Sequence, residues 1–213
     1  MAKAIVFLGP PACGKGTQSE ILSQSMEALQ ISTGMLLRKA IAEGTPAGLE
    51  AQRYVEQGLL VPDAPILDMV ADQLGDARAR NGVVFDGFPR TLNQAQQLSD
   101  LLEKANISVA KVFLIEVDLP EVIFRIAGRL ECPKCKRIYH AKLYPPKVPG
   151  VCDVCQTRLV HRSDDTEDKV KKRYAIYEKE IGPIVAYYGV TLVRINGQQA
   201  KEVIAKQIAQ FCL

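Results

Sequence analysis

The stretch Gly9-Pro-Pro-Ala-Cys-Gly-Lys-Gly-Thr17 is a glycine-rich loop that directly follows an apolar run at residues 4–8. A continuous apolar run is typical of a strand that is buried on both faces of a sheet. Apolar residues at helical spacing follow the loop, so the order is strand, loop and helix. In that setting backbone N–H groups and a helix N-terminus cradle phosphates, and Lys15 reaches the outer ones. The sequence therefore predicts a nucleoside triphosphate site at residues 9–17.

One position of this loop departs from the common pattern, because Gly16 follows Lys15 where Ser or Thr usually stands. The hydroxyl of Thr17, one residue later, can help to hold the Mg²⁺ that accompanies a triphosphate. We therefore expect ATP with Mg²⁺ to contact this loop, at Ala12, Cys13, Gly14, Lys15, Gly16 and Thr17.

Apolar runs predict strands at residues 83–85 and 111–117, and two shorter segments, residues 30–33 and 191–195, are expected to be strands as well. Helical patterns lie between them, over residues 34–80 with breaks near 44–46, 58 and 62, and over 91–105, 166–188 and 200–211. Another helix is expected to start at Pro120 and to carry Arg125 and Arg129 on one face. Strands that alternate with helices predict an α/β fold with a five-stranded parallel sheet flanked by helices.

The size and charge of the chain exclude several classes of protein. Its 213 residues, 47% hydrophobic and 24% charged, indicate a globular core domain with an insertion. A formal net charge of +3 excludes a basic protein that coats nucleic acid and an acidic disordered chain. The apolar run at residues 4–8 is too short for a membrane span or a signal peptide. We expect a cytoplasmic protein without a membrane or nucleic-acid partner.

Four of the six cysteines form two Cys-x-x-Cys pairs, Cys132 with Cys135 and Cys152 with Cys155. Two such pairs at this spacing are typical of a four-thiolate zinc site, with a redox pair as the alternative. Four thiolates leave no open position on the metal, so the zinc would be structural. It would stabilise an insertion that has few large apolar residues of its own. Cys13 and Cys212 lie far away in sequence, and we interpret them as incidental.

Three more stretches complete a recognisable set: Ile31-Ser32-Thr33-Gly34, Asp86-Gly87-Phe88-Pro89-Arg90 and Arg162-x-Asp164-Asp165. With the glycine-rich loop they occur in order over essentially the whole chain, which resembles the long form of adenylate kinases with a zinc-bearing lid. The resemblance implies a P-loop kinase fold, a monomer and the reaction ATP + AMP = 2 ADP. It divides the chain into a core (residues 1–31, 62–127 and 166–213), an AMP-binding subdomain (32–61) and a zinc-binding lid (128–165).

The resemblance also implies roles for individual residues. Arginines suit this chemistry because a guanidinium binds phosphate oxygens with two hydrogen bonds, and phosphoryl transfer depends on neutralised charge. The implied catalytic residues are Lys15, Asp86, Arg90, Arg129, Arg162 and Arg173, with Asp86 at the end of a strand holding waters of Mg²⁺. The implied ATP contacts beyond the loop are Arg125, Arg129, Ile138, Tyr139 and Gln199. The implied AMP contacts are Thr33, Arg38, Leu59, Leu60, Val61, Gly87, Phe88, Pro89, Arg90, Gln94, Arg162 and Arg173.

Two residues depart from the family pattern. Met35 stands where the family usually has an aspartate, so Asp86 would organise the magnesium waters alone, because methionine is a poor acceptor. Leu143 stands where an aromatic residue is common, so apolar contact would replace stacking on the ATP base.

Several alternatives remain open. Asp164 and Asp165 either hold the arginines or cap a helix before Thr166, and Asp86 could be an ordinary turn residue. Arg38 and Arg90 could form surface salt bridges. The acceptor could be UMP or CMP rather than AMP. A zinc-ribbon protein that acts on nucleic acid is the alternative from another class, although only 6% of the residues are aromatic.

Overall fold

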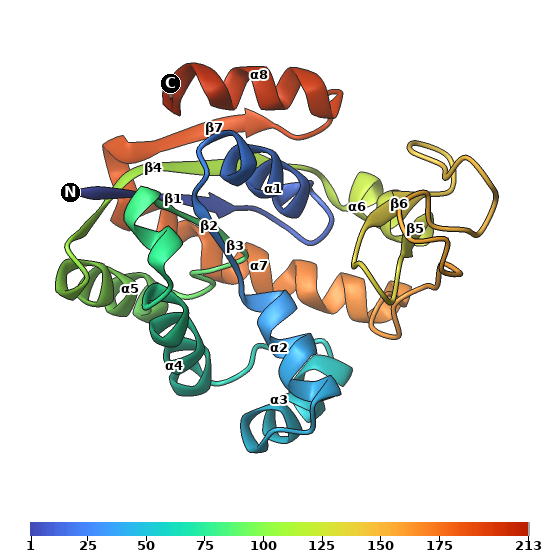
Figure 1. The fold of residues 1–213 in the computed structure, drawn as a ribbon, viewed down its shortest axis with the longest axis horizontal. Coiled ribbons are helices and arrows are strands. Elements are labelled where there is room, and N and C mark those ends of the chain that lie inside the picture. Colours follow the sequence, from blue (N-terminus) through green and yellow to red (C-terminus); the bar gives the residue numbers. More distant parts are fainter. Residues whose placement is uncertain (213) are drawn as a thin grey trace.

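A parallel sheet of five strands runs through the middle of the molecule in the order β2-β3-β1-β4-β7 (Figure 1). The computed structural model describes residues 1–212. All four neighbouring pairs are parallel, so the predicted five-stranded parallel sheet is confirmed. The strands are β1 (Ala2–Leu8), β2 (Leu29–Ser32), β3 (Val83–Asp86), β4 (Ile107–Glu116) and β7 (Leu192–Asn196).

Side chains of the central strand β1 enter two separate hydrophobic cores, one on each face of the sheet. Ala4, Val6 and Leu8 belong to one core, and Ile5 and Phe7 belong to the other. Consecutive side chains of a strand point to opposite faces, so a strand covered on both sides must be apolar throughout. This is the physical reason for the unbroken apolar run at residues 4–8.

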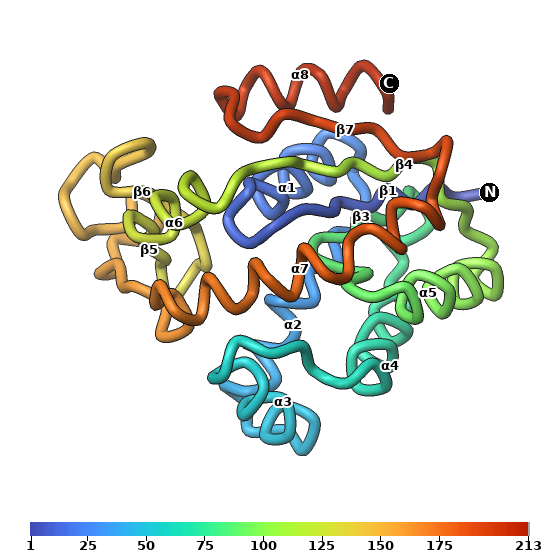
Figure 2. Tube along the Cα trace, turned by 180° about the vertical axis from the view of Figure 1, so that it is seen from behind, coloured from blue at the N-terminus to red at the C-terminus, as the bar shows by residue number. Residues whose placement is uncertain are grey.

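Helices cover both faces of the sheet (Figure 2). The first core takes apolar side chains from α4, α5 and the end of α7, and the second takes them from α1, α6 and α8. Two 3₁₀ turns, η1 (Ala77–Asn81) and η2 (Gly189–Thr191), precede β3 and β7. The helices are α1 (Lys15–Ser25), α2 (Thr33–Ala42), α3 (Pro46–Glu56), α4 (Asp63–Leu74), α5 (Leu92–Lys104), α6 (Leu119–Ala127), α7 (Glu167–Tyr188) and α8 (Lys201–Cys212).

A second, two-stranded sheet lies beside the main one, between α6 and α7 in sequence. Its strands, β5 (Arg129–Glu131) and β6 (Ile138–His140), are antiparallel. It has a small core of its own, formed by Cys132, Tyr139, Cys152 and Leu159. We call the segment of residues 129–160 the small-sheet unit.

The helix expected at Pro120 is confirmed as α6, which carries Arg125, but the prediction that it also carries Arg129 is wrong. Helix α6 ends at Ala127, and Arg129 is the first residue of β5, where it pairs with His140. Gly128 marks the change: a Cβ at this position would lie 2.3 Å from the imidazole ring of His140. The glycine therefore lets His140 of β6 pack against the end of α6. Arg129 then pairs with β6 as part of β5 instead of continuing the helix.

None of the helices within residues 1–212 combines the length and the apolar character that crossing a membrane demands.

Candidate active site

The carboxyl ends of the parallel strands meet at one edge of the sheet, which is where ligands bind in open α/β folds. The glycine-rich loop follows β1, Ser32 and Asp86 end β2 and β3, and Gly197 follows β7. A cleft of about 1620 Å³ opens at this edge and continues between the α2–α3 segment and the small-sheet unit.

Lys15 lies at the start of α1 with its ammonium group folded over the loop. Its Nζ donates hydrogen bonds to the carbonyl oxygens of Gly9 (2.8 Å) and Pro10 (2.7 Å). Gly14 has a φ of 105°, a conformation that suits glycine and lets the chain turn directly into the helix. The loop thus has the strand–loop–helix geometry that was predicted from the sequence, and the loop carbonyls hold the ammonium group of Lys15.

Asp86 is positioned beside this loop at the end of β3. Its Oδ2 accepts a hydrogen bond from Ser32 Oγ (2.9 Å). The same oxygen would lie 3.4 Å from a Cβ placed on Gly16, so the carboxylate faces the start of α1. The carboxylate of Asp86 thus lies beside Gly16, which stands between Lys15 and Thr17 in the sequence.

On the opposite side of Asp86, the segment after β3 holds Arg90 in the cleft. Arg90 Nε donates to the carbonyl oxygen of Gly87 (2.7 Å), which also accepts from Thr33 Oγ1 (3.0 Å). The protein atoms around the guanidinium lower its pKa, an effect that Asp86 opposes and Arg173 reinforces, while the residue itself is exposed to the cleft. Arg90 forms none of the salt bridges found in residues 1–212, so its terminal nitrogens can take a ligand.

Gln94 is almost fully buried, and its amide already has protein partners. The oxygen accepts from the backbone N–H of Arg90 (2.7 Å), and the nitrogen donates to Asp63 Oδ1 (2.7 Å). One hydrogen and one lone pair of the amide remain available. Sequence reasoning missed Asp63, since nothing in the local pattern links α4 to the first turn of α5.

A cluster of arginines is held by two aspartates where α7 begins. Asp165, whose side chain is only 2% exposed, forms ion pairs with both Arg129 and Arg173. Asp164 accepts from Arg173 NH1 (2.9 Å). Burial opposes ionisation of Asp165, but the hydrogen bonds and charges of the arginines outweigh it and lower its pKa. Thr166 occupies the N-cap position of α7, without a side-chain hydrogen bond to the helix. The aspartates therefore hold the arginines, and the alternative that they cap the helix is wrong.

Arg162 and Arg38 complete the cationic wall of the cleft. Arg162 forms an ion pair with Glu131 of β5, whose side chain is 8% exposed. Burial, and next the charge of Arg162, lower the pKa of Arg38 to about 10, so this guanidinium remains protonated at neutral pH. Neither Arg38 nor Arg90 forms a surface salt bridge within the described residues, which disfavours that alternative.

Arg125 occupies the far end of the cleft, beyond the glycine-rich loop. It donates to the carbonyl oxygens of Cys13 (3.2 Å) and Gly197 (2.7 Å) and pairs with Glu121 one turn earlier in α6 (2.6 Å). These contacts fix the flat guanidinium between the glycine-rich loop and the loop after β7. The i,i+4 spacing of Glu121 and Arg125 was a signal of this pair that the sequence interpretation did not use.

Most of the predicted site residues line the cleft. Those that do are Ala12, Cys13, Gly14, Lys15, Gly16, Thr17, Arg38, Leu59, Leu60, Asp86, Gly87, Pro89, Arg90, Arg125, Arg129, Ile138, Tyr139, Arg162, Arg173 and Gln199. Four others are buried behind its wall, namely Thr33, Val61, Phe88 and Gln94. Thr33 and Gln94 contact the segment of Arg90 by hydrogen bonds, so they support the cleft from behind.

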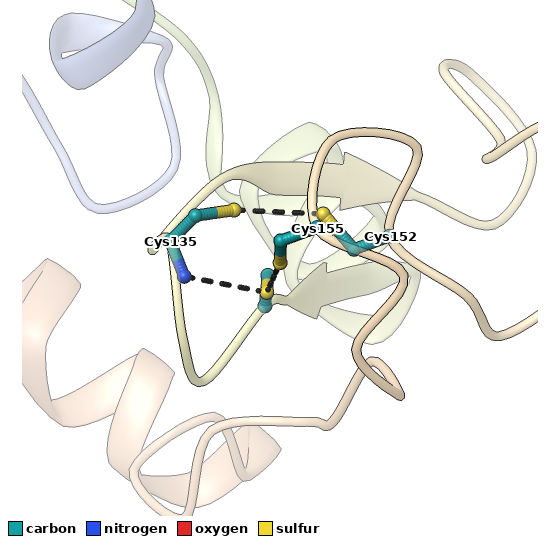
Figure 3. Close-up of side chains that lie close together, drawn as sticks. Cys135, Cys152 and Cys155 are labelled. Atoms are coloured by element: carbon teal, nitrogen blue, oxygen red, sulfur yellow. Dashed lines mark hydrogen bonds between the residues drawn. The ribbon is translucent and has the colours of Figure 1, made fainter.

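The four paired cysteines come together at one end of the small-sheet unit (Figure 3). Their sulfur atoms all lie within 4.8 Å of one another. Zinc bound to four thiolates holds the sulfurs about 3.8 Å apart. Each pair sits in the same kind of turn: Cys132 N–H donates to Arg137 (2.9 Å) and Cys152 N–H donates to Thr157 (2.9 Å). The donor set and its geometry therefore fit a tetrahedral metal ion, and none of the described cysteines is in a disulfide.

Hydrogen bonds favour a thiolate within this cluster. Tyr139 and the backbone N–H groups of Cys155 and Val154 lower the pKa of Cys152 to about 6. Tyr139 is held by Asp153, whose N–H donates to its hydroxyl (2.9 Å). A deprotonated sulfur is the form that binds a metal.

Comparison with known proteins agrees with this geometry. The family model of adenylate kinases matches residues 7–192. The chain belongs to the adenylate kinase family. It is 43% identical to the adenylate kinase of Clostridioides difficile over 206 residues, which cover 96% of this chain and 95% of the relative. It is 41% identical to that of Acholeplasma laidlawii over 213 residues (99% and 98%) and 40% identical to that of Geobacter sulfurreducens over 209 residues (97% and 96%).

Membership of the adenylate kinase family confirms the predicted fold and reaction. The chain is a phosphotransferase that interconverts ATP plus AMP with two ADP. The adenylate kinase family uses ATP with Mg²⁺. Family membership thus favours AMP as acceptor over UMP or CMP.

Both departures from the adenylate kinase pattern lie on the cleft wall. Met35 is 42% exposed and Leu143 is 44% exposed, and each lines the cleft. The residue after Leu143 is Tyr144, whose ring lies against Lys201 of α8. The sequence interpretation missed this pair, as it missed Glu131, because each contact joins segments that are distant along the chain.

Proposed function

We propose that ATP binds at the glycine-rich loop with its base toward Arg125, and that AMP binds toward Arg90 and Arg38. The observation that carries this assignment is the convergence of Lys15, Arg90 and the arginine cluster on one cleft beside Asp86. With the base of ATP at Arg125 and the phosphate of AMP at Arg90 and Arg38, Lys15 and the arginine cluster would lie between the two nucleotides. This is the position at which charge develops as the phosphoryl group moves.

The residues next to Lys15 fit a magnesium ion bound with the triphosphate. Thr17 would hold it through the hydroxyl, and Asp86 through the carboxylate, which are the hard oxygen donors that Mg²⁺ prefers. When bound, Mg²⁺ would neutralise phosphate charge. With Met35 in the place of a second carboxylate, Asp86 is the only acid among the residues assigned to that role.

The residues of this chain act by positioning and by charge. Lys15 and the arginines bind phosphate oxygens and bring donor and acceptor into line. A general base is not required, because the attacking oxygen of AMP is already an ionised phosphate. Arg129, Arg162 and Arg173 stand where they would stabilise the charge of the moving phosphoryl group.

We assign residues 128–165 as a lid that excludes water from the transfer, residues 32–61 as the AMP-binding subdomain, and the remainder as the core. Water in the cleft would accept the phosphoryl group in place of AMP, so closure protects the reaction. Zinc on Cys132, Cys135, Cys152 and Cys155 would stabilise the lid, whose own core is small. We further propose a cytoplasmic monomer that needs no membrane or nucleic-acid partner.

The assignment of the two ends is tested by replacing Arg125 with methionine and measuring both Michaelis constants. Arg125→Met should raise KM for ATP about tenfold, since a stacked cation contributes about 1–2 kcal/mol, and leave KM for AMP unchanged. Arg78→Met is the matched control, because Arg78 pairs with Asp76 outside the cleft. Equal increases of both Michaelis constants in Arg125→Met would show that the base of ATP does not lie there.

A further inference from the structure

A tyrosine of the small-sheet unit and a lysine of the core meet at the edge of the cleft. Lys201 Nζ lies 4.4 Å from the centre of the Tyr144 ring. The other cation–π contacts within residues 1–212 have distances of 5.4, 5.9 and 5.9 Å, so this one is the closest. Lys201 is the first residue of α8, which begins on the side of the molecule where the small sheet lies (Figure 1).

Both partners are fixed by backbone hydrogen bonds. The N–H of Tyr144 donates to the carbonyl oxygen of His140 (3.2 Å), and the N–H of His140 donates back to Tyr144 (3.1 Å). The carbonyl oxygen of Lys201 accepts from Gln18 Nε2 in α1 (2.9 Å). The contact therefore connects β6 of the small sheet with the helix that carries Lys15.

The pair lies at the end of the cleft that we assign to ATP. Tyr144 and Lys201 line the cleft together with Gln199 and Arg125. Arg90 and Arg38, to which we assign AMP, have as charged neighbours Asp86 and the arginine cluster. A contact here can affect the site of the donor nucleotide without touching the site of the acceptor.

We propose that Tyr144 and Lys201 are positioning residues that hold the small-sheet unit over the bound ATP. The inference rests on the proposed placement of ATP, but not on the identity of any phosphate ligand. In this chain the aromatic ring of Tyr144 follows Leu143 in the sequence, and this ring contacts Lys201 of the core rather than a nucleotide base. The contact favours the closed arrangement of the cleft, in which the unit and α8 approach each other.

The size of the effect follows from the exposure of the pair. The Tyr144 residue is 42% exposed and the Lys201 side chain is 42% exposed. Cation–π contacts at exposed sites correspond to about a two- to fivefold change in an equilibrium constant. Loss of the contact should thus raise KM for ATP about two- to fivefold and leave KM for AMP unchanged. It should not lower kcat, because reopening of a lid commonly limits turnover and becomes easier.

Four single variants, one double variant and one control test the proposal by steady-state kinetics. Lys201→Met and Tyr144→Leu remove the contact, whereas Lys201→Arg and Tyr144→Phe keep a cation and a ring and should retain the wild-type KM for ATP. The double variant Lys201→Met/Tyr144→Leu should be no worse than either single one, because the two residues act through the same contact. Lys206→Met removes a lysine from the same helix outside the cleft and should change nothing.

Hydrogen exchange gives a second measurement that does not depend on turnover. Without nucleotide, the backbone amides of residues 141–144 should exchange two to five times faster in Lys201→Met than in the wild type. The proposal is overturned if both Michaelis constants rise together, if kcat alone falls, or if Tyr144→Phe behaves like Tyr144→Leu. Unchanged exchange in Lys201→Met would overturn it as well.

Discussion

Replacing Asp165 with asparagine tests whether the arginine cluster is held in place before substrates arrive. The carboxylate accepts from Arg129 Nε (2.7 Å) and Arg173 NH2 (3.2 Å) while its side chain is 2% exposed. An amide of the same shape lacks the charge, and one of its two polar atoms cannot accept. Removing one partner of a buried ion pair costs about 3–5 kcal/mol. The arginines are 13% and 21% exposed, so water in the cleft should reduce this loss to about 2–3 kcal/mol.

The loss should appear in thermal unfolding without nucleotide. For a chain of this length, about 2–3 kcal/mol lowers Tm by about 4–12 °C. The control Glu167→Gln changes an exposed acid that pairs with Lys171 on the surface of α7; it should shift the free energy of unfolding by less than about 0.5 kcal/mol. With saturating ATP the deficit of Asp165→Asn should shrink, because phosphate oxygens replace the lost carboxylate as partners of the arginines.

The stabilisation that Asp165 contributes should depend on pH, and the direction of its pKa shift gives the sign of this dependence. The pKa of Asp165 is lowered from an ordinary value of 3.8, so its stabilisation is fully present above that value and is lost as pH falls toward the folded-state pKa. The difference in stability between the wild type and Asp165→Asn should therefore be constant near neutrality and decrease in acid. A Tm within 1 °C of the wild type, or a deficit that ATP leaves unchanged, would refute the proposed holding role.

Three further outcomes are expected. Lys15→Met should keep the fold but reduce turnover by at least a factor of about one hundred, since one such charge contributes about 3 kcal/mol; more than a tenth of wild-type turnover would contradict its role. Arg90→Ala should raise KM for AMP by about thirty- to a hundredfold while calorimetry shows unchanged ATP binding. Cys132→Ser should release one equivalent of zinc and lower Tm, but preserve part of the activity at moderate temperature, because the metal has no open position. Purified protein with two disulfides and no metal would overturn that assignment.

The features predicted correctly from the sequence depend on neighbours along the chain. The run at residues 4–8 predicts β1 because burial on two faces requires apolar side chains throughout, and the glycines after it predict the loop. The two Cys-x-x-Cys pairs predict their cluster because each pair forms one tight turn. The end of α6 could not be predicted in this way. Helical spacing places Arg125 and Arg129 together, but Gly128 ends the helix so that His140 of β6 can pack there.

The features that were missed depend on tertiary contacts. Glu131, the last residue of β5, pairs with Arg162, which follows the small-sheet unit, and no local pattern indicates such a pair. Gln94 was expected to meet a base, but its amide already contacts Arg90 and Asp63. In both cases the sequence pointed to one polar residue, Arg162 or Gln94, and gave no information about which protein group it contacts.

Most cations of the cleft already have hydrogen-bonding partners in the protein, and this sets the energetics of substrate binding. Lys15 is bound to two backbone carbonyls, Arg173 to Asp164 and Asp165, and Arg162 to Glu131. A phosphate that enters must exchange with these partners, so its net gain is smaller than that of binding to a free cation. The same contacts fix the cations before the reaction, and reorganisation in the transition state is therefore small. Because the phosphates must displace these protein partners, the affinity for bound substrates and products falls more than the stabilisation of the transition state. This suits an enzyme that must release two charged products.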